Sequence, residues 1–195
     1  FMFHPDPGLE DEVRTLAAKD VVYSFTRMLA KDSIPSGPLA SVIQGASEYQ
    51  AGQAKEVSGI RAISDAEVEF ILKRPDAQFL GRVSSPSYGL YKQAVVDAAG
   101  PAFGQSVAVG TGPYRFTERK GNDLILERND DYWAPNNGTK TVIFRTVKED
   151  TVRVAEARAG RLDATYATAP MLAGLVDRKG DSIEIKPEFA NSLPA

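Results

Sequence analysis

The clearest hydrophobic pattern in the chain predicts a helix over residues 17–30. Ala17 stands at the N-cap position, where it offers no side-chain acceptor, and Asp20 follows three residues later. Asp20 would then support the first turn through the helix dipole alone, and we expect this turn to fray, at a cost of about 1 kcal/mol relative to a threonine cap. The apolar residues recur at three- and four-residue spacing and share one face: Ala18, Val21, Val22, Phe25, Met28 and Leu29.

Shorter patterns before residue 110 alternate between helices and strands. Residues 60–63 and 68–72 flank the turn Ser64-Asp65 and predict an antiparallel pair of strands. The other predictions are a helix at 39–43, a partly helical polar stretch at 44–55, a helix at 79–83, a polar loop at 84–89 and a helix at 90–99. Residues 1–109 are therefore expected to form a small α+β lobe.

The central stretch, residues 109–133, predicts a sharp corner followed by a β-hairpin. Gly110 and Gly112 can adopt positive φ, while Pro113 fixes φ and has no N–H to donate. Residues 114–118 alternate aromatic and polar side chains, residues 120–123 form a turn, and residues 124–127 return as the partner strand. A corner where the chain passes between two lobes is also where we expect a ligand cleft.

The chain after the hairpin predicts a βαβ unit. Residues 141–147 alternate as a strand, residues 151–159 form a helix that Gly160 ends at the C′ position, and residues 162–166 return as a strand. The crossover of such a unit is right-handed. A helix at 170–176 and a strand at 183–186 follow. Residues 110–195 are therefore expected to form part of a doubly wound α/β lobe.

Composition limits the class of partner and the chemistry. The net charge of −3 argues against a nucleic-acid partner, which needs a basic face. The chain has no cysteine, which excludes disulfides and thiolate chemistry. No apolar run is long enough to span a membrane, and no signal peptide is present. Because Phe1-Met2-Phe3 resembles the end of a strand, we expect an excised fragment whose export signal lay upstream.

No catalytic constellation is found, so the chain is not expected to be an enzyme. His4 is the only histidine, which excludes a histidine-based triad or a multi-histidine metal site, and we expect it to be a surface residue beside Pro5. The charged pairs Glu127-Arg128 and Glu149-Asp150 are interpreted as solvated surface side chains. Catalysis would need a buried site with perturbed pKa values, and nothing in the sequence indicates one.

Neither a metal nor a cofactor is expected. The cluster Asn129, Asp130, Asp131, Asn136 and Asn137 offers oxygen ligands suited to calcium, but its spacing does not match an EF-hand, and capping and turn roles explain it better. The Gly110-Thr111-Gly112 stretch lacks the lysine and the following helix of a phosphate-binding loop. Tyr132 and Trp133 could form an aromatic platform for a ligand, but packing against the βαβ unit is favoured.

Three stretches carry a resemblance to a known family. G-T-G-P-Y at 110–114 followed by L-E-R-N-D-D-Y-W at 126–133 resembles the signature of the family 5 extracellular solute-binding proteins, the oligopeptide, dipeptide and nickel receptors of ABC importers. A-K-D-V-V-Y-S-F-T-R at 18–27 and A-G-R-L-D-A at 159–164 resemble two further motifs of that family. The resemblance implies a type II periplasmic-binding-protein-like fold, with 1–109 as the small extra lobe and 110–195 as part of the first ligand-binding lobe.

The resemblance also implies where a ligand binds. The loop with Ser85, Ser87 and Tyr88 is equivalent to one that borders the cleft in relatives, although an ordinary exposed connection is the alternative. Phe189 and Asn191 lie where relatives cross toward their second large lobe, and their assignment depends on the resemblance alone. The carboxylate that holds a peptide's amino terminus in relatives lies on a lobe that this chain does not contain.

The function implied is that of a receptor that binds peptides or similar small polar solutes and delivers them to an ABC permease in the membrane. Such a protein is periplasmic, or extracellular and lipid-anchored. The alternative is a ligand-sensing domain of the same fold in a transcriptional regulator, which an upstream helix-turn-helix would indicate. Because half of the cleft is missing, we expect this chain alone to bind solute weakly or not at all.

Overall fold

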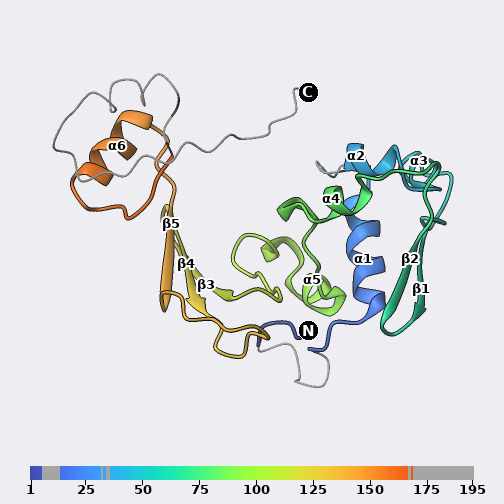
Figure 1. The fold of residues 1–195 in the computed structure, drawn as a ribbon, viewed down its shortest axis with the longest axis horizontal. Helices are drawn as coiled ribbons and strands as arrows, with labels where there is room; N and C mark the ends of the chain where they lie inside the picture. The colour runs from blue at the N-terminus through green and yellow to red at the C-terminus, as the bar shows by residue number, and fades with distance from the viewer. Residues whose placement is uncertain (6–13, 32, 34–35, 167, 169–195) are drawn as a thin grey trace. The chain divides into compact units, whose positions relative to one another are not determined.

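The computed structural model describes residues 1–5, 14–31, 33, 36–166 and 168. The chain divides into two compact units (Figure 1). The first unit consists of Phe1–Lys120 and Leu124–Ile143, and the second consists of Gly121–Asp123 and the chain from Phe144 onward. Gly110 lies inside the first unit, and the expected lobe boundary at 109/110 stays a prediction.

The main core of the first unit lies between helix α1 (Ala18–Met28) and the short elements that follow it. Phe25 and Leu29 on the apolar face of α1 are buried in this core, as the periodicity predicts. The short elements are α2 (Ser36–Ala40), α3 (Ala46–Gln50), α4 (Phe79–Val83) and the 3-10 turn η2 (Pro86–Tyr88). They contribute Leu39, Ala40, Ala46 and Phe79 to the same core, and Ile43, between α2 and α3, is buried there as well.

A two-stranded hairpin packs beside α1 (Figure 1). Strands β1 (Ile60–Ser64) and β2 (Glu67–Phe70) pair antiparallel, as predicted, with Ile60 opposite Phe70. Just before β1, the backbone of Gly59 lies against two other stretches of main chain. A Cβ at this position would come within 2.6 Å of the Gln44 carbonyl oxygen and 2.7 Å of the Ile71 carbonyl oxygen. Only a glycine fits where the three backbones meet.

The N-terminal residues build a second, smaller core in the first unit. Met2 forms an antiparallel bridge with Thr15, and the Phe3 N–H donates to the Arg14 carbonyl oxygen at 2.8 Å. Phe3 is fully buried and clusters with Val95 of α5 (Gln93–Ala99) and with Val109, which precedes the central corner. The 3-10 turn η3 (Gly100–Ala102) follows α5 directly.

The first turn of α1 is held more firmly than its sequence predicts. Asp20 Oδ2 accepts a 3.0 Å hydrogen bond from the Ala17 N–H, and the Ala17 carbonyl oxygen accepts one of 2.9 Å from the Asp20 N–H. The same carboxylate oxygen lies 2.8 Å from the Nζ atom of Lys92, which is the N-cap of α5. The expectation that Asp20 acts through the helix dipole alone is wrong, and the reason to expect fraying disappears with it.

The central hairpin continues into a three-stranded sheet of order β3-β4-β5, formed by β3 (Tyr114–Lys120), β4 (Asp123–Arg128) and β5 (Thr141–Arg145). Gly121 has φ +59° at the turn between β3 and β4, a conformation that favours glycine. The Arg128 N–H donates to Lys140 and the Thr146 N–H donates to Asn122, so β5 runs antiparallel to β4.

Helix α6 (Asp150–Arg158) of the second unit follows β5, and Gly160 ends it with φ +68°, as predicted. The expected βαβ unit is wrong, because residues 162–166 form no strand. A strand exists only where a neighbouring strand bonds to it, and the alternation of residues 162–166 carries no information about such a partner. The predicted helix at 170–176 and strand at 183–186 lie outside the described residues.

Arg153 of α6 organises the second unit in place of that strand. Its side chain is buried, and it donates to the carbonyl oxygens of Val147 at 2.7 Å and Lys148 at 3.0 Å. It also pairs with Asp150 and lies over the ring of Tyr166 at 4.3 Å. Among the helices of the described residues, none has the length and apolar character that crossing a membrane would need.

Candidate functional site

The corner at residues 110–113 is formed without unusual backbone angles. The chain bends at residues 111–113, as predicted, but neither Gly110 nor Gly112 has a positive φ. The bend is instead held by hydrogen bonds from distant residues. The His4 N–H donates to the Gly110 carbonyl oxygen at 2.8 Å, and His4 Nε2 lies 2.8 Å from the Gly112 carbonyl oxygen. The bend therefore uses ordinary φ values, and neither glycine adopts the positive φ that its missing side chain would allow.

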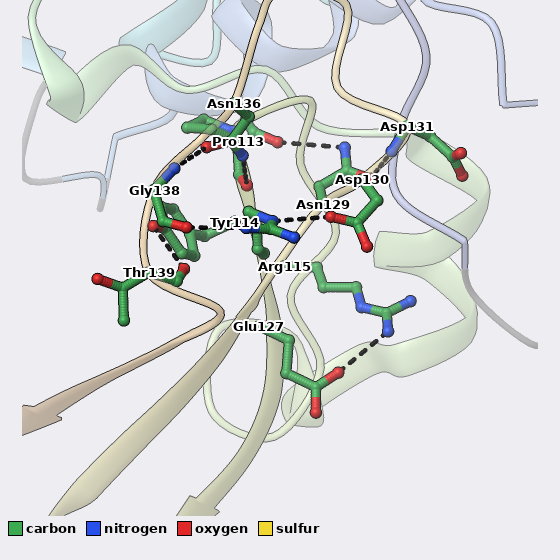
Figure 2. Close-up of polar contacts among 12 residues, drawn as sticks. Pro113, Tyr114, Arg115, Glu127, Asn129, Asp130, Asp131, Asn136, Gly138 and Thr139 are labelled. Carbon is green, nitrogen blue, oxygen red and sulfur yellow. Dashed lines mark hydrogen bonds and ion pairs between the residues drawn. The ribbon is translucent and has the colours of Figure 1, made fainter.

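The two halves of the family signature meet at this corner (Figure 2). The Asn129 N–H donates to the Pro113 carbonyl oxygen at 2.8 Å, and the Asn129 amide donates to Gly112 at 3.4 Å. The Asn136 amide also donates to Pro113, at 2.8 Å. Asn129 is buried, so its polar groups need these partners. The spacing between the two halves of the signature is therefore the length of the hairpin that returns Asn129 to the corner.

A close contact between Tyr114 and Gly138 fixes the loop that precedes β5 (Figure 2). The Tyr114 hydroxyl donates to the Thr139 carbonyl oxygen at 2.8 Å. A Cβ at Gly138 would lie 2.5 Å from that hydroxyl oxygen. Arg128 donates to the Gly138 carbonyl oxygen at 2.9 Å. A larger residue at this position would therefore have to displace the tyrosine hydroxyl from its bond to Thr139.

The polar residues that follow β4 form hydrogen bonds and an ion pair with other residues of the protein. The Asp131 N–H donates to the Asn129 side-chain oxygen at 3.2 Å, which is an Asx turn. Asp130 pairs with Arg128 at 2.7 Å, and the Asn136 side-chain oxygen accepts from the Gly138 N–H at 3.4 Å. These bonds give the cluster the turn role that the sequence favoured. No group of three or more histidine, aspartate or glutamate side chains placed for a metal ion occurs within the described residues.

His4 is buried, with 5% of its surface exposed, so the expectation of a surface residue is wrong. Its two neighbours, Phe3 and Pro5, gave no sign of this, because its hydrogen-bond partners, Gly110 and Gly112, lie more than a hundred residues away. Burial lowers the pKa of His4 below its usual value, the hydrogen bond to Gly112 acts in the opposite direction, and the positive charges of Arg115 and Arg14 lower it further.

Trp133 is exposed over 65% of its surface, and the expectation that it packs against a βαβ unit is wrong. It makes an edge-to-face contact with Phe1 at 5.2 Å and a tilted contact with Tyr132 at 5.3 Å. Phe1 is exposed over 67% of its surface. The three rings form an aromatic cluster at the surface of the first unit.

The expected ligand residues Ser85, Ser87 and Tyr88 lie together in and beside the turn η2. The Ser85 hydroxyl caps this turn by accepting from the Ser87 N–H at 3.4 Å. The Tyr88 ring stacks on Phe25 with centroids 6.3 Å apart, and burial raises the pKa of its hydroxyl, against the effect of Arg82. Ser87 is exposed. The loop is thus anchored through Tyr88 and offers the Ser87 hydroxyl to solvent.

The other two expected ligand residues, Phe189 and Asn191, lie outside the described residues. The residues that sequence reasoning missed are His4 and Asn129 as the partners of the corner. The motif spacing could have indicated Asn129, since the second half of the signature begins at the end of the returning strand. No pattern in the sequence indicates His4.

The second unit carries a groove of about 430 Å³ beside the turn before β4 and the start of α6. Arg145 and Asp123 form one wall and bind each other through two hydrogen bonds of 2.8 Å. Lys148, Glu149 and Glu156 also line the groove, and Glu156 binds Arg161. Hydrogen bonds from Arg161 lower the pKa of Glu156. The groove therefore presents both signs of charge, with most of its charged groups already engaged.

The fold is that of the type II periplasmic binding proteins. A periplasmic oligopeptide-binding protein (OppAIV) from Borrelia burgdorferi superposes with a TM-score of 0.74 at 23% identity, over 91% of this chain and 38% of that one.

The chain belongs to the bacterial extracellular solute-binding proteins of family 5, whose "family 5 Middle" model matches residues 14–193. It is 28% identical over 185 residues to di/tripeptide-binding protein 4 of Pseudomonas aeruginosa (strain UCBPP-PA14), covering 87% of this chain and 34% of that protein. It is 30% identical over 184 residues to the dipeptide-binding protein DppE of Bacillus subtilis (strain 168), covering 87% of this chain and 32% of that protein. The chain thus spans about a third of the length of these relatives.

Proposed function

We propose that this chain is part of the solute-binding receptor of an ABC importer, and that its solutes are peptides. The observation that carries this proposal is the family match over residues 14–193, together with relatives named for dipeptides and tripeptides. Under this proposal the protein works outside the cytoplasmic membrane, in the periplasm or attached by a lipid, and passes its ligand to a permease. The same relatives favour this role over that of a sensing domain in a transcriptional regulator.

We further propose that the loop at Ser85, Ser87 and Tyr88 borders the ligand cleft. The stacking of Tyr88 on Phe25 supports this, because an anchored loop keeps its hydroxyl groups in place and loses little entropy on binding. The exposed Ser87 hydroxyl is the group that we assign to hydrogen bonding with a peptide backbone. The assignment of Phe189 and Asn191 to the same cleft still rests on the family resemblance.

Calorimetry on the complete gene product tests the receptor role and the solute class separately. We expect dipeptides or tripeptides to bind with a dissociation constant of about 1 μM or below, equivalent to roughly 8 kcal/mol. Free amino acids and nickel ions serve as competing solute classes. Binding of another class without peptides would contradict the peptide assignment, and a complete lack of solute binding would contradict the receptor role.

The second test compares the peptide affinity of the isolated chain with that of the complete gene product. With one side of the cleft missing, we expect peptide affinity to be at least about a hundredfold weaker than in the complete product, because the ligand loses the contacts and the enclosure that the other side of a cleft supplies. Submicromolar binding to the isolated chain would contradict this. Cell fractionation with an antibody against the chain tests the location, and recovery in the cytoplasmic fraction would contradict it.

A further inference from the structure

The imidazole of His4 contacts the corner with both of its nitrogen atoms. Nε2 lies 2.8 Å from the carbonyl oxygen of Gly112, and Nδ1 lies 3.4 Å from the backbone nitrogen of Gly110. A carbonyl oxygen only accepts a hydrogen bond, and a backbone N–H only donates one. The ring must therefore carry its hydrogen on Nε2 and an unshared electron pair on Nδ1, which is one of the two neutral tautomers.

Protonation of the ring is incompatible with half of this arrangement. The imidazolium has an N–H on each nitrogen, so Nδ1 would present a hydrogen toward the Gly110 N–H. The bond to Gly112 would survive, but the contact with Gly110 would become repulsive. The main-chain bond from the His4 N–H to the Gly110 carbonyl oxygen lies beside this contact and would be strained with it.

Among the described residues, the charged side chains that shift the pKa of the ring are positive, so they offer the imidazolium no counter-ion. Arg14, on the neighbouring segment, is buried and donates to Phe3, and Arg115 lies on β3. Lys92 of α5 lies 5.4 Å above the adjacent Phe3 ring. Burial and the positive charges of Arg115 and Arg14 lower the pKa of His4 and so oppose protonation of the ring.

In the described part of the chain, the carboxylates bound to Lys92 and Arg115 are already engaged. Asp20 binds Lys92 at 2.8 Å, and Glu127 binds Arg115 at 3.0 Å. The remaining polar neighbour is the neutral Asn129 amide, which shares the Gly112 carbonyl oxygen with the ring. Among the described residues, no carboxylate hydrogen-bonds to His4, so none of them compensates a positive charge on the ring.

We propose that His4 is a proton-sensitive clasp, whose neutral ring holds the Gly110–Gly112 corner against the N-terminal segment and whose protonation releases it. The corner joins the Phe3 core to the start of β3, and Asn129 of the family signature depends on its position. Release at this point therefore loosens the seam between the N-terminal segment and the hairpin before the main core around Phe25 unfolds. This inference does not depend on the solute.

The sign of the pH effect follows from proton linkage. The folded state lowers the pKa of His4, so the unfolded and released states bind the proton more tightly. Stability of the corner is fully present above the ordinary histidine pKa of about 6.5. It falls as the pH drops through that value and levels off below the lowered pKa of the folded state. The equilibrium constant for closing the corner falls about tenfold for each pKa unit that separates the His4 pKa in the folded state from that in the released state.

The presence of a single histidine allows a direct test by NMR on this chain. We expect the ¹⁵N spectrum to show hydrogen on Nε2 at neutral pH, and the titration to give a pKa below 6.5. Hydrogen-exchange protection of the His4 and Gly110 amides, corrected for intrinsic exchange, should fall as the ring is protonated. Protection of the Ile71 amide, which bonds to Gly59 in the main core, should not change. Hydrogen on Nδ1, a pKa at or above 6.5, or pH-independent protection of the corner would each overturn the proposal.

Two variants distinguish a pH-dependent role of His4 from a purely structural role. His4→Gln keeps a donor for Gly112 but cannot titrate in this range, so the corner should lose its pH dependence. Arg115→Gln removes a positive charge that lowers the His4 pKa, so it should raise both that pKa and the pH of release. An unchanged pH dependence in His4→Gln would contradict the clasp. If that variant fails to fold, the tautomer and pKa of the wild-type ring still decide the question.

Discussion

The Nζ atom of Lys92 lies 2.8 Å from Oδ2 of Asp20, and only 5% and 3% of these two side chains are exposed. Lys92 also donates to the Thr15 carbonyl oxygen at 3.0 Å, so the ammonium group has two oxygen partners. Asp20 lies in the first turn of α1, and Lys92 is the N-cap of α5. This buried ion pair therefore fixes the starts of two helices that are far apart in the sequence.

Replacing Lys92 by Met should destabilise the chain strongly. The substitution leaves the Asp20 carboxylate buried without its cation, and such uncompensated charges cost about 3–5 kcal/mol. The double variant Asp20→Asn with Lys92→Met leaves no buried charge, and it should recover a large part of that loss. Urea unfolding followed by circular dichroism measures the free energy of both variants.

The matched control for this pair is Arg115→Gln. Arg115 binds Glu127 at 3.0 Å, but both side chains are about half exposed, and exposed pairs contribute about 0–1 kcal/mol. A loss from Lys92→Met no larger than the loss from this control would show that the buried pair does not hold the helices.

Replacing Gly59 by Ala should also destabilise the main core. The new methyl group would meet two carbonyl oxygens at 2.6 and 2.7 Å, and main chain cannot move aside as a side chain does. We expect a loss of about 1–3 kcal/mol, the usual range for overpacking. The control is Gly81→Ala in α4, where no atom lies within 4 Å of the added carbon. That change should be neutral or stabilise by up to about 1 kcal/mol, and equal losses in the two variants would contradict the close contact.

The contact between Tyr114 and Gly138 predicts a coupled pair of substitutions. Gly138→Ala alone should destabilise the loop before β5, because the new carbon would meet the tyrosine hydroxyl at 2.5 Å. Tyr114→Phe removes that oxygen along with its bond to Thr139 and costs about 1 kcal/mol. The double variant should be more stable than the sum of the single losses by about 1 kcal/mol or more. A double-mutant cycle in thermal unfolding measures this coupling, and additive losses would contradict it.

The two serines of the proposed cleft loop should separate stability from ligand binding. Ser85→Ala removes the hydroxyl that caps η2 and should lower stability by about 0.5–1 kcal/mol. The Ser87 hydroxyl makes no hydrogen bond within the described residues, so Ser87→Ala should leave the melting temperature unchanged. In the complete gene product, Ser87→Ala should weaken peptide binding about three- to tenfold, the value of one hydrogen bond. If calorimetry finds the same peptide affinity in Ser87→Ala as in the wild type, Ser87 is not part of the ligand site.

The elements of this fold follow from local patterns, whereas the contacts that position them do not. The apolar stripe of α1, the hairpin β1–β2, the bend at the corner and the C′ glycine after α6 were all predicted, since each depends on residues close together in the chain. His4 was misjudged because its partners lie more than a hundred residues away, and for Asp20 no pattern in the sequence indicated Lys92, seventy-two residues away. A buried polar residue is explained by its partner, and periodicity says nothing about partners.

The same limit applies to the sheet and to the candidate site. The strand expected at residues 162–166 had suitable alternation, but the structure pairs β5 with β4 and holds this segment through Arg153 instead. Ser85 and Ser87 lie in one turn because they are close together in sequence, and their role at a cleft stays a prediction. Their relation to Phe189 and Asn191 depends on chain outside the described residues and stays a prediction.

The exposed edge-to-face pair of Trp133 and Phe1 gives this protein a built-in fluorescent reporter. As the only tryptophan, Trp133 accounts for all indole emission, and its solvent contact should place that emission toward long wavelengths and leave it open to quenching by iodide. Any additional lobe, ligand or permease that covers this surface should shift the spectrum to the blue and protect it from the quencher. Assembly around the corner can therefore be followed optically, without a label.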